Sequence, residues 1–492
     1  MGLRRWFPAF AARAARTTTL APVVAGAVAS VLAFVLACVL ANPARAAPHG
    51  PFLKAPYVQS LHADSVEVRL ELDPPAGAVL EISQISPAPS SARSIEQPDV
   101  QASHVFHVDK LAPLTRYDYF VRAGGAVSGK GTFTTAPRES SPGDAASFKF
   151  LVYGDTRSDD AAHAVLVRAL LQAPGDFIVN TGDFVERGGS ARDWQTFFDI
   201  EGPLLRDRCV FACVGNHELF DDAAGAAYAR YFGPSNGKLY GTFRWSNARF
   251  FLLNAFHSWT GGEEREWLTR ELEHADTEPD LAWRIVVVHQ GPFSAGIHGA
   301  SLDLRAAKIP ELLSLHKVDL VVSGHDHIYE RGLATAPSYD LRYVVSGGGG
   351  APLYRDITPL ASTRKVEAAY HVIEAEVTES AVNLVARRAD GSILERCGFT
   401  HSPGWTCDGA KLASPGAGSL AATGSPPPAA SLARSTAPQG KPGATDPASP
   451  RCACRAVGAS TARRAPAAAL AIAGLLGVAV AIRRARRTRR PR

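Results

Sequence analysis

The chain has 492 residues, of which 46% are hydrophobic and 20% charged, as is ordinary for a globular protein. This length is enough for more than one domain. The formal net charge of +5 does not indicate a nucleic-acid-binding domain, because arginines near the two ends supply much of the positive charge. The middle of the chain has no basic stripe interleaved with aromatic residues, so the composition gives no sign of nucleic-acid binding.

The N-terminal segment has the features of an export signal. Arginines among the first 16 residues precede an apolar run over residues 20–41, and Ala44-Arg45-Ala46 offers a small-x-small cleavage site. We therefore predict that residues 1–46 are a signal peptide, with an uncleaved membrane anchor as the alternative. Arg4-Arg5-Trp6-Phe7 resembles a twin-arginine export motif incompletely, which leaves the choice between Sec and twin-arginine export open.

Residues 50–137 are predicted to form a β-sandwich. Residues 65–72 alternate apolar and polar side chains with period two, which is typical of a half-buried strand. The Leu-x-Pro-x-Thr-x-Tyr-x-Tyr stretch over residues 111–119 resembles a strand pair of fibronectin type III domains, and residues 131–135 supply a closing strand. A polar linker over residues 138–146 follows.

Residues 147–400 are predicted to form an α/β layered domain. Five short apolar runs, typical of buried strands, end abruptly in polar clusters. The clusters are Gly154-Asp155, Gly182-Asp183, Gly215-Asn216-His217-Glu218, His289 and Gly324-His325-Asp326-His327. Helical spacing over residues 161–171, 263–274 and 310–316 alternates with the strands, as layered α/β domains require.

The polar clusters point to a metal centre. In open α/β sheets the ligand site lies at the carboxyl ends of the strands, so the five clusters should converge on one crevice. Together they carry two Asp, one Asn and three His as candidate ligands, a set that suits a pair of transition-metal ions.

In their order, these blocks resemble the calcineurin-like metallophosphoesterase superfamily, and the extension Ile328-Tyr329-Glu330-Arg331 resembles its purple acid phosphatase branch. The resemblance implies an α-β-β-α layered domain with two ions of Fe, Zn or Mn. Asp183 would bridge the two ions, because a shared anion offsets their mutual repulsion. The other ligands would be Asp155 and His327 for one ion, and Asn216, His289 and His325 for the other.

The same resemblance implies a mechanism in which a metal-bound hydroxide attacks phosphorus in line, with no covalent phospho-enzyme. His217 would serve the leaving-group oxygen as a general acid or charge stabiliser, or would only orient its neighbours. Residues 182–188 resemble the second block of Ser/Thr phosphoprotein phosphatases, with Glu in place of Asp. By that resemblance Glu186 orients His217 and Arg187 binds substrate phosphate; the alternative is a solvated Glu-Arg pair. His298 would face the substrate or be an exposed loop residue.

Two positions depart from these patterns. Arg157 stands where the superfamily usually has a His ligand, and Glu186 stands where purple acid phosphatases have a Tyr ligand. One metal shell is therefore short of a protein ligand. Either Glu186 or water fills the gap, or the ion binds weakly, and a ferric-tyrosinate colour should be absent. Arg157 would then steer substrate anions or hold its loop.

The C-terminal region is predicted to tether the enzyme to a surface. Residues 401–464 are rich in Pro, Ala, Ser and Gly, which predicts a flexible linker. Residues 465–492 hold an apolar stretch followed by an arginine cluster, just long enough to span a bilayer. With the upstream Cys452 and Cys454, this end resembles a myxobacterial sorting tail, which implies processing and cell-surface attachment. A plain single-span anchor is the alternative.

The remaining cysteines give two further predictions. Cys397 and Cys407 lie close in sequence and could pair in an exported protein. Cys209 and Cys213 share one predicted strand, too far apart to bridge, and should be buried thiols.

Taken together, the sequence predicts an exported, surface-tethered two-metal phosphoesterase, most simply an acid phosphatase-like phosphomonoesterase acting on a phosphate ester. A phosphodiesterase or nucleotide hydrolase is the alternative within this class. A surface adhesion or binding protein with a degenerate metal site is the alternative from another class. Substrate, metal identities and oligomeric state are left open.

Overall fold

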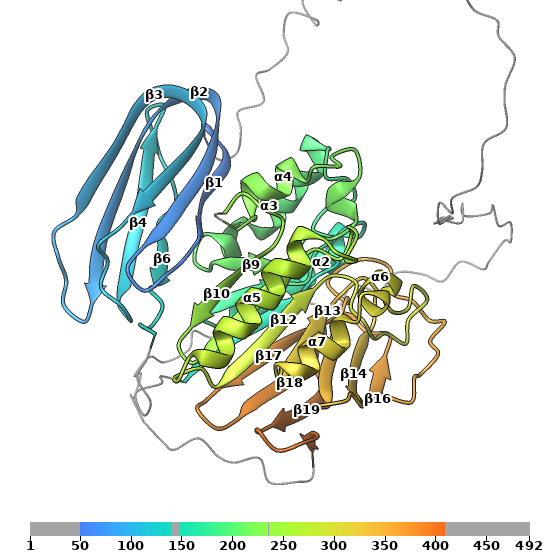
Figure 1. Ribbon diagram of the computed structural model, residues 1–492. Helices are drawn as coiled ribbons and strands as arrows, with labels where there is room; N and C mark the ends of the chain where they lie inside the picture. The colour runs from blue at the N-terminus through green and yellow to red at the C-terminus, as the bar shows by residue number, and fades with distance from the viewer. Residues whose placement is uncertain (1–49, 140–146, 235, 409–492) are drawn as a thin grey trace, which may run out of the picture. The chain divides into compact units, whose positions relative to one another are not determined.

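The computed structural model describes residues 50–139, 147–234 and 236–408 (Figure 1). The predicted signal peptide and the predicted anchor lie outside these residues, as does most of the predicted linker. Within the described ranges, no helix is long and apolar enough to cross a membrane.

The N-terminal domain is an antiparallel β-domain of hydrogen-bonded strands. They are β1 (Phe52–Gln59), β2 (Val66–Ser86), β3 (Arg93–Val108), β4 (Arg116–Ala123), β5 (Ala126–Val127) and β6 (Gly131–Thr134). β2 runs well beyond the alternating segment that predicted it, through Pro74 and Pro75, with an irregular register between Glu71 and Ala76. This irregularity lets its first half pair with β1 and its second half with β4. A fibronectin type III identity for this domain stays a prediction.

The second domain contains two seven-stranded sheets. One sheet has the order β10 (Gly241–Trp245), β11 (Ala248–Leu253), β12 (Trp283–Val288), β13 (Leu320–Ser323), β15 (Leu341–Ser346), β14 (Tyr329–Ala334), β16 (Thr363–Glu367). The other has the order β20 (Thr406–Cys407), β19 (Ile393–Phe399), β18 (Val382–Arg388), β17 (His371–Val377), β7 (Phe148–Tyr153), β8 (Phe177–Asn180), β9 (Val210–Ala212). The helical segments are α2 (Asp160–Gln172), α3 (Ala191–Leu205), η1 (His217–Leu219), α4 (Ala226–Tyr231), α5 (Glu263–Thr277), α6 (Leu302–Ala306) and α7 (Ile309–Leu315).

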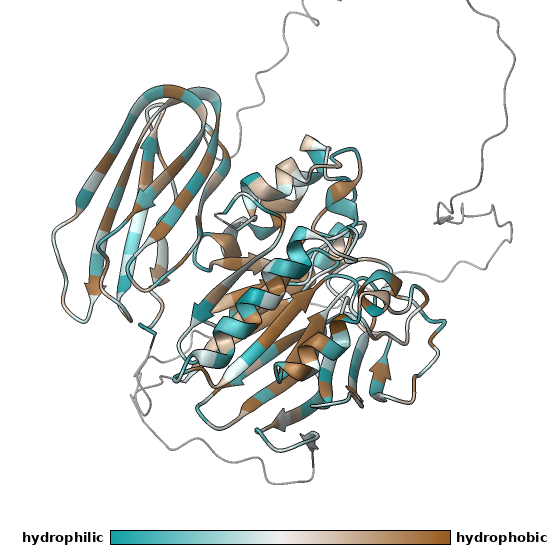
Figure 2. Ribbon diagram, in the orientation of Figure 1, coloured by the Kyte–Doolittle hydropathy of each residue, from teal (hydrophilic) through white to brown (hydrophobic). Residues whose placement is uncertain are grey.

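The sheets pack face to face, and helices cover their outer faces. Phe150 of β7 and Phe250 of β11 meet in the core between the sheets, with ring centroids 5.3 Å apart. Helices α2 and α3 bury their apolar sides with Leu151 and Ile178 on one outer face. Helices α5 and α7 bury their apolar sides on the outer face of the other sheet. Figure 2 shows that the strands are mostly hydrophobic, whereas α5 keeps a hydrophilic side. The predicted order, an all-β domain followed by an α-β-β-α domain, is therefore confirmed.

The five strands that predicted the site are present as β7, β8, β9, β12 and β13. The first three run parallel in one sheet, and β12 and β13 run parallel in the other. Strands buried on both faces read as continuous apolar runs, which is why the sequence marked them clearly. Their carboxyl ends supply the candidate site from both sheets.

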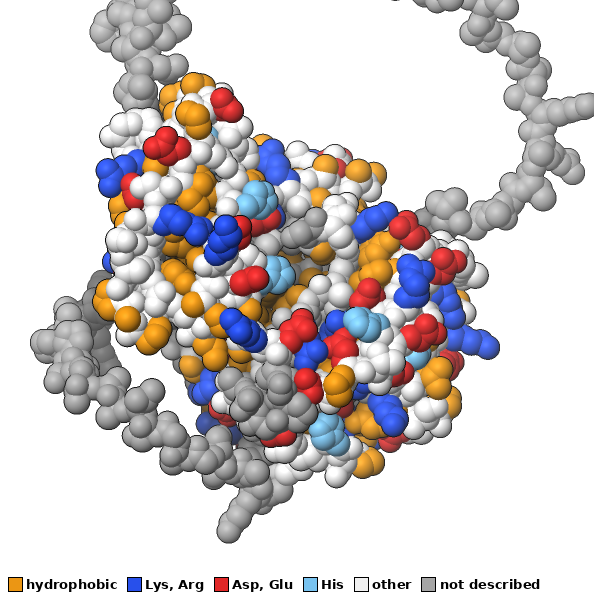
Figure 3. All heavy atoms as spheres, turned by 60° about the vertical axis from the view of Figure 1, so that its left-hand side comes forward, with side chains coloured by type: hydrophobic (Ala, Val, Ile, Leu, Met, Phe, Trp, Pro, Cys, Tyr) orange, Lys and Arg blue, Asp and Glu red, His pale blue; other side chains and the backbone are white. Residues whose placement is uncertain are grey.

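Charges of both signs are interspersed on the face of the molecule shown in Figure 3, and no continuous basic surface gathers there. The expectation that the protein has no nucleic-acid-binding domain stays a prediction.

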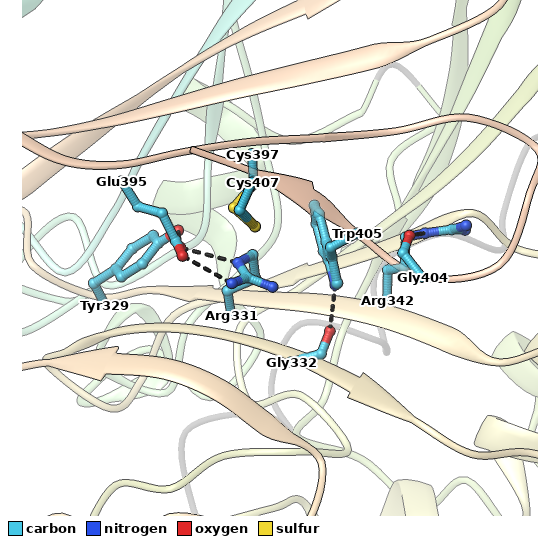
Figure 4. Close-up of a disulfide and its surroundings, with 9 residues drawn as sticks. All are labelled: Tyr329, Arg331, Gly332, Arg342, Glu395, Cys397, Gly404, Trp405 and Cys407. Carbon is cyan, nitrogen blue, oxygen red and sulfur yellow. Dashed lines mark hydrogen bonds and ion pairs between the residues drawn. A yellow bond between two sulfur atoms is a disulfide. The ribbon is translucent and has the colours of Figure 1, made fainter. Parts of the chain in front are cut away.

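The residues just after β19 belong to the folded domain. Cys397 and Cys407 form a disulfide, as predicted, and β20 pairs with β19 (Figure 4). The Trp405 indole donates to the carbonyl of Gly332 (2.9 Å), and Arg342 donates to the carbonyl of Gly404 (2.8 Å). A linker beginning at residue 401 is therefore wrong, because residues up to Asp408 are anchored by these contacts. Cys209 and Cys213 are buried free thiols, as predicted.

Truncation after Asp408 should leave the folded domain as stable as the full chain, whereas truncation after His401 should destabilise it. The shorter variant loses Cys407 and Trp405, and it removes the carbonyls of Ser402 and Gly404, which accept from the buried guanidinium of Arg342. Loss of the disulfide alone should cost roughly 2–4 kcal/mol. Thermal unfolding of both variants checks this, and equal midpoints would show that the segment contributes nothing.

Candidate metal centre

The predicted ligands lie beyond strand ends, and three of the six have a backbone conformation that few residues adopt. Asp155, Asp183 and His325 have positive φ angles of 59°, 57° and 69°. The glycines beside them are required by close packing. A Cβ on Gly182 would lie 2.8 Å from Nδ1 of His289, and a Cβ on Gly324 would lie 2.4 Å from Oδ2 of Asp155. Only glycine lets these turns approach so closely.

One group of donors comes from both sheets. His289, buried at the end of β12, donates from Nδ1 to the carbonyl of Thr181 (2.6 Å), which turns Nε2 towards Asp183. Nε2 lies 3.3 Å from Oδ1 of Asp183 and 3.2 Å from Nδ1 of His325. One ligand atom of each of these three residues lies within 4.8 Å of the other two. This spacing suits a single small cation.

Asn216 supplies an independent observation. Its side-chain oxygen Oδ1 is buried and has no hydrogen-bond partner. Leaving a buried acceptor unpaired costs about 1–3 kcal/mol, so such an atom calls for an explanation. The next residue, His217, donates its N–H to Oδ1 of Asp183 (3.1 Å), so Asn216 belongs to a loop held against this donor group, and amide oxygens bind metal ions. The donor set therefore fits one metal ion.

Asp155 and His327 form a second group. His327 donates from Nδ1 to the carbonyl of Pro352 (2.7 Å), and its Nε2 lies 3.6 Å from Oδ1 of Asp155. Arg157 enters the same group. Its Nε donates to Oδ2 of Asp183 (3.1 Å), and its Nη2 lies 3.4 Å from Nε2 of His327. A guanidinium thus lies among the donors expected to hold the other ion.

His217 faces the centre, but its orientation comes from the main chain of Glu186. Nδ1 of His217 lies 2.8 Å from the Glu186 carbonyl oxygen and 3.9 Å from the carboxylate Oε1 of the same residue. The Glu186 carboxylate instead accepts from Ser158 and from Arg157, the latter at 3.2 Å. The main chain therefore makes the closer contact to His217. Nε2 of His217 lies 3.9 Å from Oδ2 of Asp183.

Arg187 and His298 differ in their distance from the centre. The Arg187 side chain is 65% exposed and lies 3.7 Å from Asp221, which fits a solvated pair better than a phosphate ligand. The His298 ring lies 4.5 Å from that of His325, at the rim of the donor group. Its Nε2 is 3.1 Å from the Tyr354 hydroxyl.

Three residues without a predicted role support the site. The buried carboxylate of Glu218 accepts the main-chain N–H groups of Gly215, Asp183 and Phe184 at 2.8–2.9 Å and so ties two ligand loops together. Asp326 accepts the N–H of His298 (2.9 Å), and the Tyr354 ring stacks on His327 with centroids 4.1 Å apart. Glu218 and Asp326 stand inside the sequence blocks, but nothing local distinguishes a loop-holding carboxylate from a ligand.

The calcineurin-like phosphoesterase family model matches residues 148–329, which include all five strand ends. Purple acid phosphatase 4 of Arabidopsis thaliana is 35% identical over 250 residues, which are 43% of this chain and 70% of that protein. The chain belongs to the calcineurin-like phosphoesterase family. It is a metallophosphoesterase related to the purple acid phosphatases.

A second relative of this phosphoesterase is matched over less of its own length. Uncharacterized protein MT2654 of Mycobacterium tuberculosis is 29% identical over 277 residues, covering 47% of this chain and 51% of that protein. The chain thus spans about half the length of that relative. The structure of purple acid phosphatase PPD1 from yellow lupin superposes with a TM-score of 0.59 at 17% identity, covering 70% of this chain and 74% of that chain. This likeness shows a shared fold.

Burial and neighbouring charges shift the pKa values of the three candidate histidine ligands of the phosphoesterase in different directions. Burial lowers the pKa of His327 to about 3 and holds that of His325 well below its usual value, so both rings are neutral, as metal ligands must be. Burial opposes the charge on His289 too, but Asp183 and Asp155 raise its pKa to about 9. A metal must therefore displace a proton from His289, which couples metal binding to pH.

The two carboxylates behave in opposite ways. Burial, together with the charge of Asp183, holds the pKa of Asp155 well above its usual value. Burial acts on Asp183 as well, but His289, His217 and Arg157 outweigh it and hold the pKa of Asp183 well below its usual value. Of these two carboxylates, Asp183 is thus the one whose negative charge its surroundings favour.

Proposed function

We propose that the protein is a metal-dependent phosphomonoesterase of the acid phosphatase kind. The observation that carries this proposal is the buried, unpartnered Oδ1 of Asn216, in the loop whose His217 N–H donates to Oδ1 of Asp183. A binding protein that had lost its metal would have no reason to keep this amide oxygen buried and unpaired. The relationship to purple acid phosphatases supports the choice of phosphate esters as substrates.

In this proposal Asp183, Asn216, His289 and His325 hold a transition-metal ion such as Fe, Zn or Mn. Such an ion lowers the pKa of a bound water to around 7 and polarises phosphoryl oxygens. Asp155 and His327 extend the donor set on the side of Arg157, where the family typically holds the second ion of a dinuclear centre. Asp183 has an oxygen towards each side, as a bridging carboxylate requires.

His217 is proposed to protonate the leaving alkoxide. Since its Nδ1 faces the Glu186 carbonyl, the proton of the neutral ring sits on Nδ1, and only the imidazolium carries a proton on Nε2. That nitrogen is on the side of Asp183 and the candidate ligands. Donation of the Nε2 proton would neutralise the leaving oxygen as its bond to phosphorus breaks.

Several other features are proposed along with this activity. Residues 50–137 and 147–408 are the two folded domains, with a fibronectin type III-like identity for the first. The proposed organisation also includes export through the segment 1–46. It continues with a linker from residue 409 onwards and surface attachment through residues 465–492. His298 is proposed to contact substrate at the rim of the site. Arg187 contributes only if its loop moves, since it now pairs with Asp221.

The test is hydrolysis by the metal-loaded protein of a panel of phosphomonoesters, phosphodiesters and nucleotides. Monoesters should be turned over fastest, and thorough chelation should remove activity by at least about 100-fold, because no covalent route replaces the metal. Readdition of Zn, Mn or Fe should restore it. Faster turnover of diesters would assign the phosphodiesterase alternative, and turnover undiminished by chelation would refute a metal-dependent mechanism.

A further inference from the structure

The side chain of Arg157 lies inside the donor set rather than at its edge. The side chain is 13% exposed, and its Nε donates to Oδ2 of Asp183 at 3.1 Å. Its Nη1 donates to Oε2 of Glu186 at 3.2 Å. The guanidinium therefore has carboxylates on two sides, which is the environment that a metal cation would otherwise occupy.

A third neighbour of the guanidinium is the lone pair of His327. Because Nδ1 of His327 faces the Pro352 carbonyl at 2.7 Å, the ring carries its proton there and Nε2 is an acceptor. Nη2 of Arg157 lies 3.4 Å from that nitrogen. The electron pair that His327 would offer to a metal is thus already directed at an N–H group.

The two carboxylate oxygens of Asp183 face different groups. Oδ1 lies 3.3 Å from Nε2 of His289, on the side of the candidate metal ligands, whereas Oδ2 faces Arg157. A guanidinium has five N–H donors, no lone pair and a permanent positive charge, so it cannot serve as a ligand and repels a cation placed beside it. These donors therefore do not fit a second metal ion.

We propose that Arg157 takes the place of one of the two metal ions, so that Asp183 bridges a single ion and a fixed guanidinium. This inference rests on the proposed function of the same site. The planar guanidinium can bind two phosphoryl oxygens at once, and it would offset the negative charge of the substrate that a second ion otherwise offsets. The class of ligand is a phosphate ester held between one metal ion and one arginine.

Metal content tests the inference without an activity measurement. The full-length protein, loaded with Zn or Mn and freed of excess metal, should contain one ion per chain by elemental analysis. Arg157→His introduces the missing imidazole ligand and removes the guanidinium, so this variant should contain two ions per chain. Arg187→His, which adds the same imidazole at an exposed position, is the matched control and should stay at one.

Electron paramagnetic resonance of the manganese-loaded proteins gives a second readout. The wild-type protein should show the signal of an isolated ion, and Arg157→His should show two magnetically coupled ions. Two ions in the wild-type protein would overturn the inference, and this result is obtained even if the variant fails to fold. One ion in a folded Arg157→His variant would overturn it as well.

The two proposals can fail separately. If the wild-type protein hydrolyses phosphate esters and contains two ions, the proposed role of Arg157 is refuted while the proposed function stands. One ion without hydrolysis would leave the single-ion centre in place and refute the function. If both hold, Arg157→Gln should lower kcat by about 10²-fold, as for loss of one preorganised donor to a transition-state oxygen.

Discussion

Asp183→Asn should reduce phosphoester hydrolysis more than any other single substitution among the candidate ligands. Its carboxylate lies 3.3 Å from His289 and 3.1 Å from Arg157, so it makes closer contacts with both halves of the centre than Asp155 does. Loss of outer-shell partners typically costs 10–100-fold in metal affinity or activity, and loss of a direct anionic ligand should cost at least about 100-fold. Steady-state kinetics together with elemental analysis of the purified variant measure both effects.

Asp221→Asn is the matched control, because the Asp221 side chain is exposed and forms its ion pair with the exposed Arg187, away from the donor groups. That variant should keep its metal and its activity. The assignment of Asp183 is wrong if Asp155→Asn proves more damaging while Asp183→Asn retains its metal.

His217→Ala should lower kcat most for esters with poor leaving groups. A general acid matters when the departing alkoxide is strongly basic and matters little when it is a stable nitrophenolate. The expected loss is on the order of 10²–10⁴-fold for alkyl esters. Metal content should be unchanged, because Asn216 and not His217 belongs to the donor group. His274→Ala, which removes an exposed imidazole from α5, should have no effect on kinetics.

The pH dependence of this effect follows from the environment of His217. Burial lowers its pKa below the ordinary histidine value, although Asp183 acts in the opposite direction. The imidazolium that donates Nε2–H is therefore present below that lowered pKa and is lost as pH rises through it. The gap between wild type and His217→Ala on alkyl esters should accordingly widen towards acid pH. An equal loss for good and poor leaving groups at every pH would argue for a positioning role instead.

Local signals were sufficient for the strands and for the candidate ligands. Each of β7, β8, β9, β12 and β13 is a continuous apolar run followed by a tight turn, so its end could be located without knowing its neighbours. The division of these strands between two sheets depends on pairing partners far along the chain, such as β17 beside β7. The sequence therefore indicated the convergence of the clusters but contained no local sign of that pairing.

The contacts within the site were harder to predict. That Arg157 points at Asp183 and His327 depends on a side-chain direction set by the whole loop, and the residue type alone left a substrate-steering role equally open. The contact of Glu186 with His217 through its carbonyl cannot be read from side-chain chemistry. Tyr354 comes from a region without any motif, and the anchored segment up to Asp408 begins with Ser402-Pro403-Gly404, the residue types that predicted a linker.

The positive φ angles of Asp155, Asp183 and His325 also affect how this protein would respond to selection. A side chain in left-handed backbone typically costs of order 1 kcal/mol or more, a cost that glycine avoids. The charge of Asp183 is stabilised by Arg157 and His289, but burial opposes the charge of Asp155, so at Asp155 and His325 the fold would gain stability from substitutions that destroy its chemistry. Variants enriched by heat challenge alone should therefore accumulate changes at these two positions before they accumulate in the sheets.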